Sequence, residues 1–323
     1  MRRIEHAKVA VIGGAGFLGS HLVDYLIEDR ACDVLVLDCL INGHRKFIHR
    51  DATFLWFDIR DAEQALFKVF QDHRIEYVFN YAAEPYIPVS FKRPLHVFNI
   101  NAFAMLKVLH AAHEAGVKAI LQVSSAEIYG EANGKIKESD VIVPHSSYGV
   151  SKVAADSFVQ VRWRENRTPA VALRQFNCVG RRETHPYVIP EIIQQIGQRT
   201  SGKVAVRLGN NSVRDFIAAR DAVRLAVELL EKGEFGEVYN LGSEEAIQIY
   251  DLAKLIGRLM GVEVEIEVDE SRKRPWEIWH LQSDNSKLYS VIEGRPMINL
   301  ERALEEAISY YVENSHRWDF DWT

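Results

Sequence analysis

The chain has 323 residues, of which 47% are hydrophobic and 26% charged, with a formal net charge of -6 at pH 7. This composition predicts a globular protein that buries a sizeable core, with one large α/β domain and a smaller second one. The mild negative charge and the lack of a basic stripe argue against nucleic-acid binding. Three cysteines without metal-ligand spacing indicate ordinary core thiols in a reducing compartment, so no metal site is expected.

The N-terminal segment has two arginines followed by an apolar stretch at 9–18. Glycines interrupt this stretch and no small-residue cleavage site follows it, so a secretion signal is not expected. No apolar run is long enough to span a bilayer. We therefore expect a cytoplasmic protein without membrane association.

The first half of the chain alternates short apolar runs with longer helical patterns. Runs that predict strands buried on both faces lie at 9–13, 33–38, 53–58, 77–83 and 120–125. Helical patterns lie at 19–29, 62–73 and 101–116. This alternation predicts βαβ units and an α/β fold with a Rossmann-type, doubly wound parallel sheet.

The second half begins with a predicted helix over 147–166 and a strand over 170–177, after which the alternation becomes irregular. A run at 237–242 predicts a strand that rejoins the main sheet. We expect residues 1–177 to form the larger, Rossmann-type domain, rejoined by a segment near 213–243. Residues 178–323 would form most of a smaller C-terminal α/β lobe. The aromatic tail at 317–322 could pack on the body or on a partner.

Glycines lie between the first predicted strand and the first helix, in the segment Gly13-Gly-Ala-Gly16-Phe17-Leu18-Gly19. Glycine permits a tight turn and close approach of the backbone to a pyrophosphate, whose charge the following helix N-terminus favours. Asp38 ends the next predicted strand, about 20 residues further on, where an acid accepts the ribose hydroxyls. Its carboxylate would repel a 2′-phosphate, so the sequence favours NAD over NADP.

Tyr148 and Lys152 lie at positions i and i+4 of the predicted helix 147–166 and therefore share one face. An ammonium beside a phenol lowers the pKa of the phenol. Such a tyrosine can take the proton of a sugar hydroxyl while hydride leaves the same carbon. The pair alone is common on amphipathic helices, but the preceding strand ends at Ser125 and delivers a hydroxyl to the ligand-binding edge of the sheet.

Together these motifs resemble the extended short-chain dehydrogenase/reductases, specifically the nucleotide-sugar epimerase/dehydratase family, over nearly the whole chain. The resemblance implies that Ser125 orients the substrate hydroxyl, that Tyr148 is the base, and that Lys152 supports Tyr148 and the nicotinamide ribose. The cofactor site that it implies consists of Gly13, Gly16, Phe17, Leu18, Gly19, Asp38, Asp58, Ile59, Ala82, Ala83, Asn101, Tyr148 and Lys152.

The substrate site implied by the resemblance holds a nucleotide diphosphate-sugar. Asn177, Arg214 and Arg274 would contact the diphosphate, which bidentate arginines grip well. Tyr187 lies in a loop that faces the base and the sugar, where it either stacks on the base or packs as a core aromatic. The family's Gly-Pro-Arg is Gly180-Arg-Arg here, so this loop toward the nucleotide is expected to differ.

Glu127 bears on the chemistry after oxidation at C4. Once C4 is a ketone, the C5 proton is acidic, and a carboxylate can abstract it before the C6 hydroxyl leaves as water. In the family, 4,6-dehydratases and UDP-glucuronate decarboxylases have a glutamate here, whereas simple 4-epimerases have a small or neutral residue. Ala126 replaces the Asp of glucose-type dehydratases, so Glu127 would serve as base and acid in turn.

The sequence therefore predicts an NAD-dependent NDP-hexose 4,6-dehydratase. The alternatives are an NDP-sugar 4-epimerase or C4 dehydrogenase, and then a UDP-glucuronate decarboxylase. Glu127 itself could instead be a solvated carboxylate beside the site. A non-enzymatic NAD-binding scaffold would be expected to lack Tyr148 or Lys152, and both are present. The resemblance also implies a homodimer that pairs helices 101–116 and 147–166.

Overall fold

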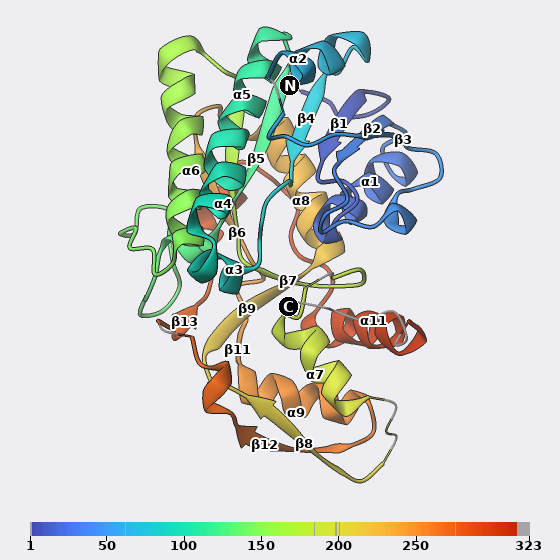
Figure 1. Ribbon diagram of the computed structural model, residues 1–323, viewed down its shortest axis with the longest axis vertical. Coiled ribbons are helices and arrows are strands. Elements are labelled where there is room, and N and C mark those ends of the chain that lie inside the picture. Colours follow the sequence, from blue (N-terminus) through green and yellow to red (C-terminus); the bar gives the residue numbers. More distant parts are fainter. Residues whose placement is uncertain are drawn as a thin grey trace.

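A parallel sheet of seven strands forms the centre of the larger half of the molecule, with helices on both faces (Figure 1). The computed structural model describes residues 2–61, 63–183, 185–197, 199, 201–274 and 276–314, so the aromatic tail at 317–322 lies outside the described residues. The strand order is β10-β6-β5-β4-β1-β2-β3. These strands are β1 (Lys8–Ile12), β2 (Asp33–Asp38), β3 (Thr53–Trp56), β4 (Tyr77–Asn80), β5 (Ala119–Ser125), β6 (Ala170–Gln175) and β10 (Val238–Leu241).

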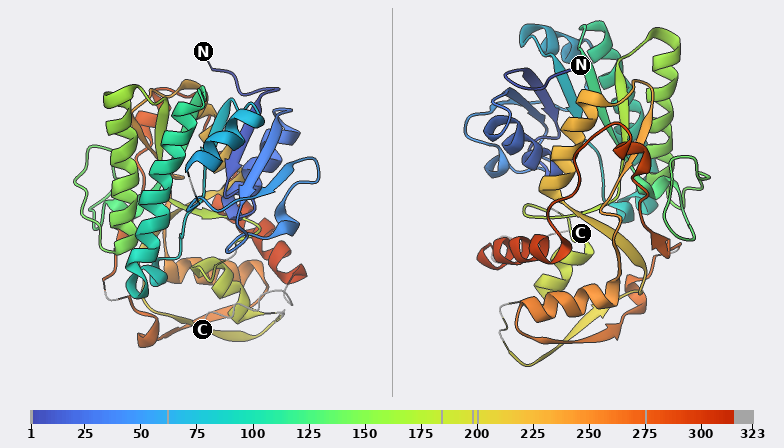
Figure 2. Two further views of the ribbon diagram at one scale, coloured as in Figure 1. Left: turned by 45° about the horizontal axis from the view of Figure 1, so that its top comes forward. Right: turned by 180° about the vertical axis from the view of Figure 1, so that it is seen from behind.

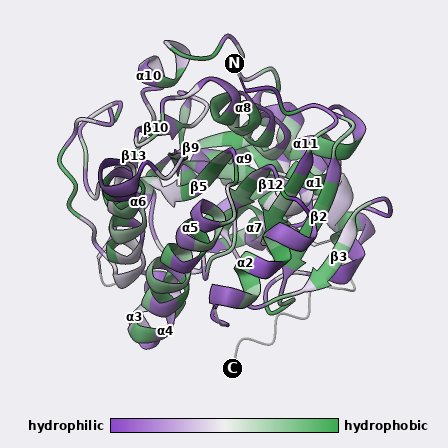
Figure 3. Ribbon diagram, turned by 90° about the horizontal axis from the view of Figure 1, so that it is seen from above, coloured by the Kyte–Doolittle hydropathy of each residue, from purple (hydrophilic) through white to green (hydrophobic). Residues whose placement is uncertain are grey.

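Two layers of helices cover this sheet, one on each face. Side chains alternate along each strand and so pack against both layers. In β1, Val9 and Val11 pack into the core on one face, whereas Ala10 and Ile12 pack into the core on the other. Figure 3 shows the hydrophobic strands enclosed by helices of mixed polarity. The first layer contains α1 (Phe17–Glu28), α8 (Ala219–Lys232) and α10 (Ser286–Tyr289), and the second contains α2 (Glu63–Asp72), α5 (Met105–Glu114) and α6 (Ser147–Asn166). The rear view in Figure 2 shows the golden α8 in front of the sheet.

The helix expected over 101–116 begins earlier, at Pro94. After α3 (Ile87–Lys92), α4 (Pro94–Phe98) continues through a π-helical turn (Asn99–Ala104) into α5. Proline suits the first turn of a helix because its missing N–H has no partner there. By length and composition the helix Pro94–Glu114 could cross a membrane, but half of its apolar window is buried within the protein. A packed core helix meets the same criteria, so this is weak evidence for membrane insertion.

Short sheets flanked by helices build the smaller half (Figure 1). Strand β9 pairs with β7, β11 and β13, and β8 pairs with β12 in parallel. A separate hydrophobic core lies among these elements. The strands are β7 (Asn177–Val179), β8 (Lys203–Leu208), β9 (Val213–Ala218), β11 (Ala246–Gln248), β12 (Glu263–Val268) and β13 (His280–Leu281), and the helices are α7 (Val188–Ile196), α9 (Ile249–Leu259) and α11 (Leu300–Glu313).

The α/β fold class with a doubly wound parallel sheet is confirmed. The run at 170–177 is not one strand, because β6 ends at Gln175 and β7 leaves the large sheet to pair with β9. Of the segment 213–243, α8 and β10 return to the large half, whereas β9 belongs to the smaller one. The chain therefore crosses between the halves several times, and the carboxyl ends of β1, β4 and β5 lie at the crossing.

Candidate active site

A cavity of about 690 Å³ lies at the carboxyl ends of the large sheet's strands, between the two halves. This is the edge where open α/β sheets bind their ligands. The predicted site residues that line the cavity are Gly13, Gly16, Phe17, Leu18, Gly19, Asp38, Asp58, Ile59, Ala82, Ala83, Ser125, Glu127, Tyr148, Lys152, Asn177, Tyr187, Arg214 and Arg274. Asn101 is the one predicted site residue that does not line it.

The glycine turn before α1 is packed too tightly for side chains at two positions. A Cβ at Gly13, whose φ is +77°, would lie 2.7 Å from the backbone nitrogen of Ala82, and a Cβ at Gly19 would lie 2.0 Å from the Gly13 carbonyl oxygen. Gly16 caps α1 and gives it no side-chain hydrogen bond. The first N–H groups of α1 thus remain for a ligand, as an anionic pyrophosphate requires.

Asp38 lies at the end of β2 beside this turn. Its Oδ2 accepts a hydrogen bond from the Ala15 backbone N–H over 3.0 Å, and its Oδ1 accepts one from Leu40 over 2.8 Å. Burial raises the pKa of Asp38, and these two hydrogen bonds oppose that shift. Asp58, at the next strand end, is bound by the Arg60 guanidinium, whose hydrogen bonds lower the pKa of Asp58. The structure therefore fits an adenosine ribose beside Asp38.

Replacing Asp38 with asparagine is expected to weaken the preference for NAD over NADP by about tenfold or more, since a charge-assisted hydrogen bond and a repulsive charge are both lost. Titration of the cofactor-free chain with each dinucleotide measures the ratio of the two Kd values. Asp58→Asn is the matched control. Because Arg60 already neutralises the Asp58 carboxylate, this variant should keep the ratio of the two Kd values. An unchanged Kd ratio in Asp38→Asn would contradict the role of this residue.

Ser125, Tyr148 and Lys152 meet where β5 ends and α6 begins. The Ser146 hydroxyl caps α6 by accepting from the Gly149 N–H over 3.0 Å, which sets Tyr148 on the first turn. A side chain at Gly149 would approach Pro144 to 2.8 Å and the Glu127 carbonyl oxygen to 3.0 Å. Glycine at this position therefore lets the catalytic helix pack directly against the turn after β5.

The pKa of Tyr148 is raised in the protein itself, so the lowering expected from Lys152 is not the dominant effect. Burial raises the pKa of Tyr148, a hydrogen bond with Ser125 lowers it, and the charges of Glu127 and Glu84 raise it. The Lys152 ammonium donates to the Val123 carbonyl over 3.2 Å and lies 5.8 Å from the centre of the phenol ring. Desolvation thus shifts both groups toward their uncharged forms.

Burial lowers the pKa of Lys152 to about 8, with the charge of Asp156 opposing the shift. The ammonium is therefore present below this pH and lost above it. If the charge supports Tyr148 and the nicotinamide ribose, kcat/KM should fall as the pH rises through about 8. A pH profile of kcat/KM tests this, and a profile that stays level well above that pH would contradict it.

Glu127 lies in a 3-10 turn (Ala126–Ile128) directly after β5. The Ser125 hydroxyl accepts from the Glu127 N–H over 3.2 Å, which closes this turn. Burial raises the pKa of the Glu127 carboxyl, while the charges of Arg274 and Arg214 lower it. A carboxyl with a raised pKa beside a tyrosine and a serine is suited to exchange protons with a substrate.

The predicted diphosphate ligands Arg214 and Arg274 converge on a carboxylate that the sequence analysis missed. Arg214 donates to Glu277 Oε1 over 2.8 Å, and Arg274 lies 4.0 Å from the same oxygen. The Asn210 amide binds the other oxygen of Glu277. Glu277 follows Arg274 by three residues, and this spacing was the available signal in the sequence. The Glu277 carboxylate is only 9% exposed.

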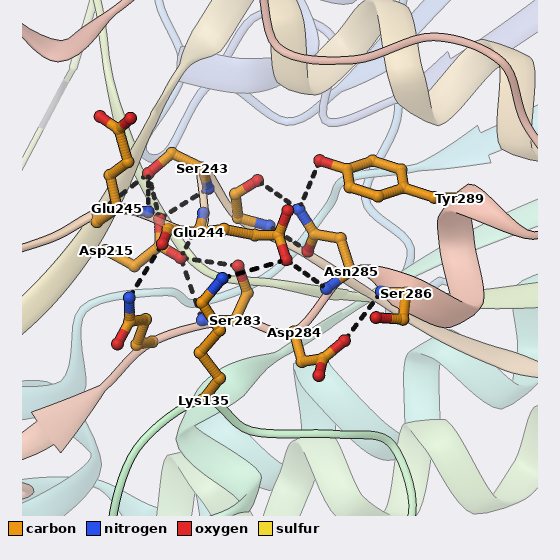
Figure 4. Close-up of polar contacts among 12 residues, drawn as sticks. Lys135, Asp215, Ser243, Glu244, Glu245, Ser283, Asp284, Asn285, Ser286 and Tyr289 are labelled. Carbon is orange, nitrogen blue, oxygen red and sulfur yellow. Dashed lines mark hydrogen bonds and ion pairs between the residues drawn. The ribbon is translucent and has the colours of Figure 1, made fainter.

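Asp215 anchors the strand that carries Arg214 (Figure 4). Its carboxylate accepts hydrogen bonds from the backbone N–H and the hydroxyl of both Ser243 and Ser283, and from the Glu244 N–H. These contacts tie β9 to the loop after β10 and to the chain beyond β13. Arg214 therefore lies on a strand that is fixed on two sides.

Tyr187 lines the cavity, and its contacts bear on the two alternatives for its ring. The Tyr187 hydroxyl donates to the Pro85 carbonyl over 2.7 Å, and its ring contacts the rings of Tyr86 and His185, each at 5.7 Å. This arrangement favours the packed-aromatic alternative over stacking on a base.

Asn101 is buried behind the cavity wall, where its amide binds the backbone N–H and C=O of Glu84 and donates to the Ser151 hydroxyl. It therefore holds the wall in place and does not line the cavity. Glu84 itself lines the cavity, is only 6% exposed and was missed in the sequence, because a lone glutamate after a strand has no diagnostic spacing.

Comparisons with known proteins agree with this site. Residues 9–242 match the model of the NAD dependent epimerase/dehydratase family. The human dTDP-D-glucose 4,6-dehydratase is 30% identical over 96% of this chain and 91% of its own length. The UDP-glucose 4-epimerase of Lacticaseibacillus casei is 34% identical over 79% of this chain and 82% of its own length.

Solved structures with this fold include both an epimerase and a dehydratase. The UDP-glucose 4-epimerase of Thermotoga maritima, solved with UDP-glucose, superposes with a TM-score of 0.88 at 28% identity, over 95% of this chain and 99% of its own. A dTDP-glucose 4,6-dehydratase from Streptomyces venezuelae, solved with NAD, gives 0.86 at 25% identity, over 97% and 99%. With its glycine turn, its Tyr-x-x-x-Lys helix and these relatives, the chain belongs to the NAD-dependent epimerase/dehydratase family.

Proposed function

We propose that the chain is an NDP-hexose 4,6-dehydratase. The observation that carries this proposal is that Glu127 lines the same cavity as Ser125 and Tyr148, one turn from the strand end that presents Ser125. A plain exchange of configuration at C4 needs a base at C4 and none at C5. A carboxyl with a raised pKa at this position provides the second proton acceptor that elimination needs.

The residues can be assigned to successive proton transfers. The glycine turn, Asp38 and Lys152 would hold NAD, which would supply the exchange of hydride and a positive charge that favours the Tyr148 phenolate. Ser125 orients the C4 hydroxyl and Tyr148 takes its proton. Glu127 then takes the proton from C5 and delivers it to the departing C6 hydroxyl, which leaves as water. C5 then takes up a proton from water as C6 is reduced, and Tyr148 releases its proton to water, so the products are a 4-keto-6-deoxy sugar and one water molecule.

Two alternatives use the same oxidation. A 4-epimerase or C4 dehydrogenase is supported by the relatives with epimerase activity, and in that case Glu127 only lies beside the sugar. A UDP-glucuronate decarboxylase also uses a glutamate at this position. Incubation with a panel of NDP-hexoses and UDP-glucuronate separates the three. A 4-keto-6-deoxy product supports the proposal, whereas epimer exchange or CO2 release without that product would contradict it.

We also infer a cytoplasmic homodimer. The three cysteines, all free, are consistent with a reducing compartment. Apolar side chains are exposed on the outer faces of the helix Pro94–Glu114 and of α6. They are Leu95, Phe98, Phe103, Val150 and Val161, with exposed fractions of 86%, 43%, 54%, 47% and 38%. An apolar face of this kind on neighbouring helices is typical of a subunit interface.

Phe103→Glu is expected to convert the dimer to a monomer, because it places a charge in the middle of this apolar face. Light scattering coupled to size-exclusion chromatography measures the mass. Val268→Glu is the matched control, since Val268 is also about half exposed but lies on β12 in the smaller half. A dimer that persists in Phe103→Glu would place the interface elsewhere.

A further inference from the structure

A buried polar network lies behind the active site, with Arg174 of β6 at its centre. The Arg174 side chain is 2% exposed and donates to Asp156 Oδ2 over 2.9 and 2.6 Å. It also donates to the Tyr129 hydroxyl over 2.6 Å, and that hydroxyl donates to Asn240 Oδ1 over 2.6 Å. Tyr129, Asp156 and Asn240 are each no more than 2% exposed. Proton transfers with the substrate do not require any of these four groups.

One end of the network reaches the helix of the Tyr-x-x-x-Lys pair. Asp156 lies one turn beyond Lys152 and two turns beyond Tyr148, so the three share one face of α6. Arg174 fixes Asp156 from the neighbouring strand. The charge of Asp156 in turn raises the pKa of Lys152. This face of α6 is thereby held against β5 and β6.

The other end reaches the turn that carries Glu127. Tyr129 follows the 3-10 turn directly, and its backbone N–H donates to the Ala126 carbonyl over 3.1 Å. Its side chain points to Arg174 and Asn240, so the turn is anchored at its C-terminal end as well as at Ser125. Along the chain, Glu127 and Tyr148 are joined by a loop. Its apolar residues Val141 and Val143 are exposed.

A buried charged network of this kind is costly in desolvation, and a well-packed apolar set is often as stable. The network, however, connects the Glu127 turn to α6, so it can fix the position of Glu127 relative to Tyr148. Displacement of a reacting group by about 1 Å can reduce a rate by about 100-fold. We propose that Tyr129 is a positioning residue that, through Arg174, holds the Glu127 turn in register with Tyr148 and Lys152. The inference rests on the proposed function, since it concerns the step after oxidation at C4.

Tyr129→Phe removes one hydroxyl and keeps the ring, so it tests the positioning directly. We expect the reduction of bound NAD by the NDP-hexose to keep its rate, while formation of the 4-keto-6-deoxy product slows by about tenfold, as expected for one lost hydrogen bond. The absorbance of reduced nicotinamide should then build up during turnover, a signature that a general loss of stability does not produce. Stopped-flow absorbance and product assays measure the two steps.

Tyr239→Phe is the matched control. Tyr239 is 1% exposed and its hydroxyl accepts from the Glu234 N–H over 3.2 Å, away from the Glu127 turn, so this variant should retain both rates. The inference is overturned if Tyr129→Phe leaves product formation unchanged, or if NAD reduction falls in parallel with it. Glu127→Gln in the same assay tests the proposed function separately: unaffected elimination in Glu127→Gln would refute the dehydratase, whatever Tyr129→Phe does.

Discussion

Tyr148→Phe is expected to reduce kcat by about 1,000-fold while the protein retains bound NAD. In the proposed function the Tyr148 phenol takes the C4 hydroxyl proton, and it lies at the start of α6, where Ser125 lowers its pKa. Phenylalanine fills the same buried space, so packing around Tyr148 is preserved. Turnover of the NDP-hexose and the NAD content of the purified protein are the two measurements.

The choice of phenylalanine separates chemistry from folding. Tyr148 is buried in a small cluster with Ile87 and Val97, and loss of its ring would leave a cavity. Tyr148→Ala should therefore lower the melting temperature as well as the rate, whereas Tyr148→Phe should lower the rate alone. Substantial turnover in Tyr148→Phe would show that another group takes the proton.

Much of the fold can be predicted from features that are local in the sequence. Strands buried on both faces, such as β1 and β5, appear as continuous apolar runs because each residue meets one of two cores. The strand-glycine-helix pattern at 9–28 is also local, since its turn depends on glycines that other residues cannot replace without backbone clashes. The family and the fold class predicted from these patterns are both confirmed.

Contacts between distant segments could not be predicted in this way. Glu277 gains its role from Arg214 and Asn210, which lie more than 60 residues earlier. Tyr187 is held by Pro85, 102 residues away, so its packing depends on how the two halves meet. The raised pKa of Tyr148 was not predicted, because adjacency to Lys152 can be recognised on a helix but the depth of burial cannot.

Glu127→Gln is expected to reduce formation of the 4-keto-6-deoxy product by about 100-fold to 10,000-fold, with oxidation at C4 retained. The amide has the same shape as the carboxyl but cannot take the C5 proton. Hydride would then remain on the cofactor, so the absorbance of reduced nicotinamide should rise and persist after mixing with substrate. Rapid-mixing absorbance and product analysis measure the two effects.

The pH dependence gives an independent check. Because burial raises the pKa of Glu127 above the ordinary value of 4.5, the base form is lost as the pH falls toward that raised pKa. Single-turnover elimination by the unmodified enzyme should therefore fall on the acid side at a higher pH than an exposed carboxylate would produce. In Glu127→Gln this dependence should disappear from the residual rate.

Glu277→Gln is the matched control for loss of a carboxylate in the same cavity. Glu277 contacts Arg214 and lies near Arg274, so its replacement should change the KM for the nucleotide sugar and leave the balance between oxidation and elimination unaltered. If Glu127→Gln instead retains full product formation, Glu127 is a bystander and the 4,6-dehydratase is refuted. If it abolishes NAD reduction as well, Glu127 acts before C5 deprotonation, at the oxidation that epimerases and dehydratases share.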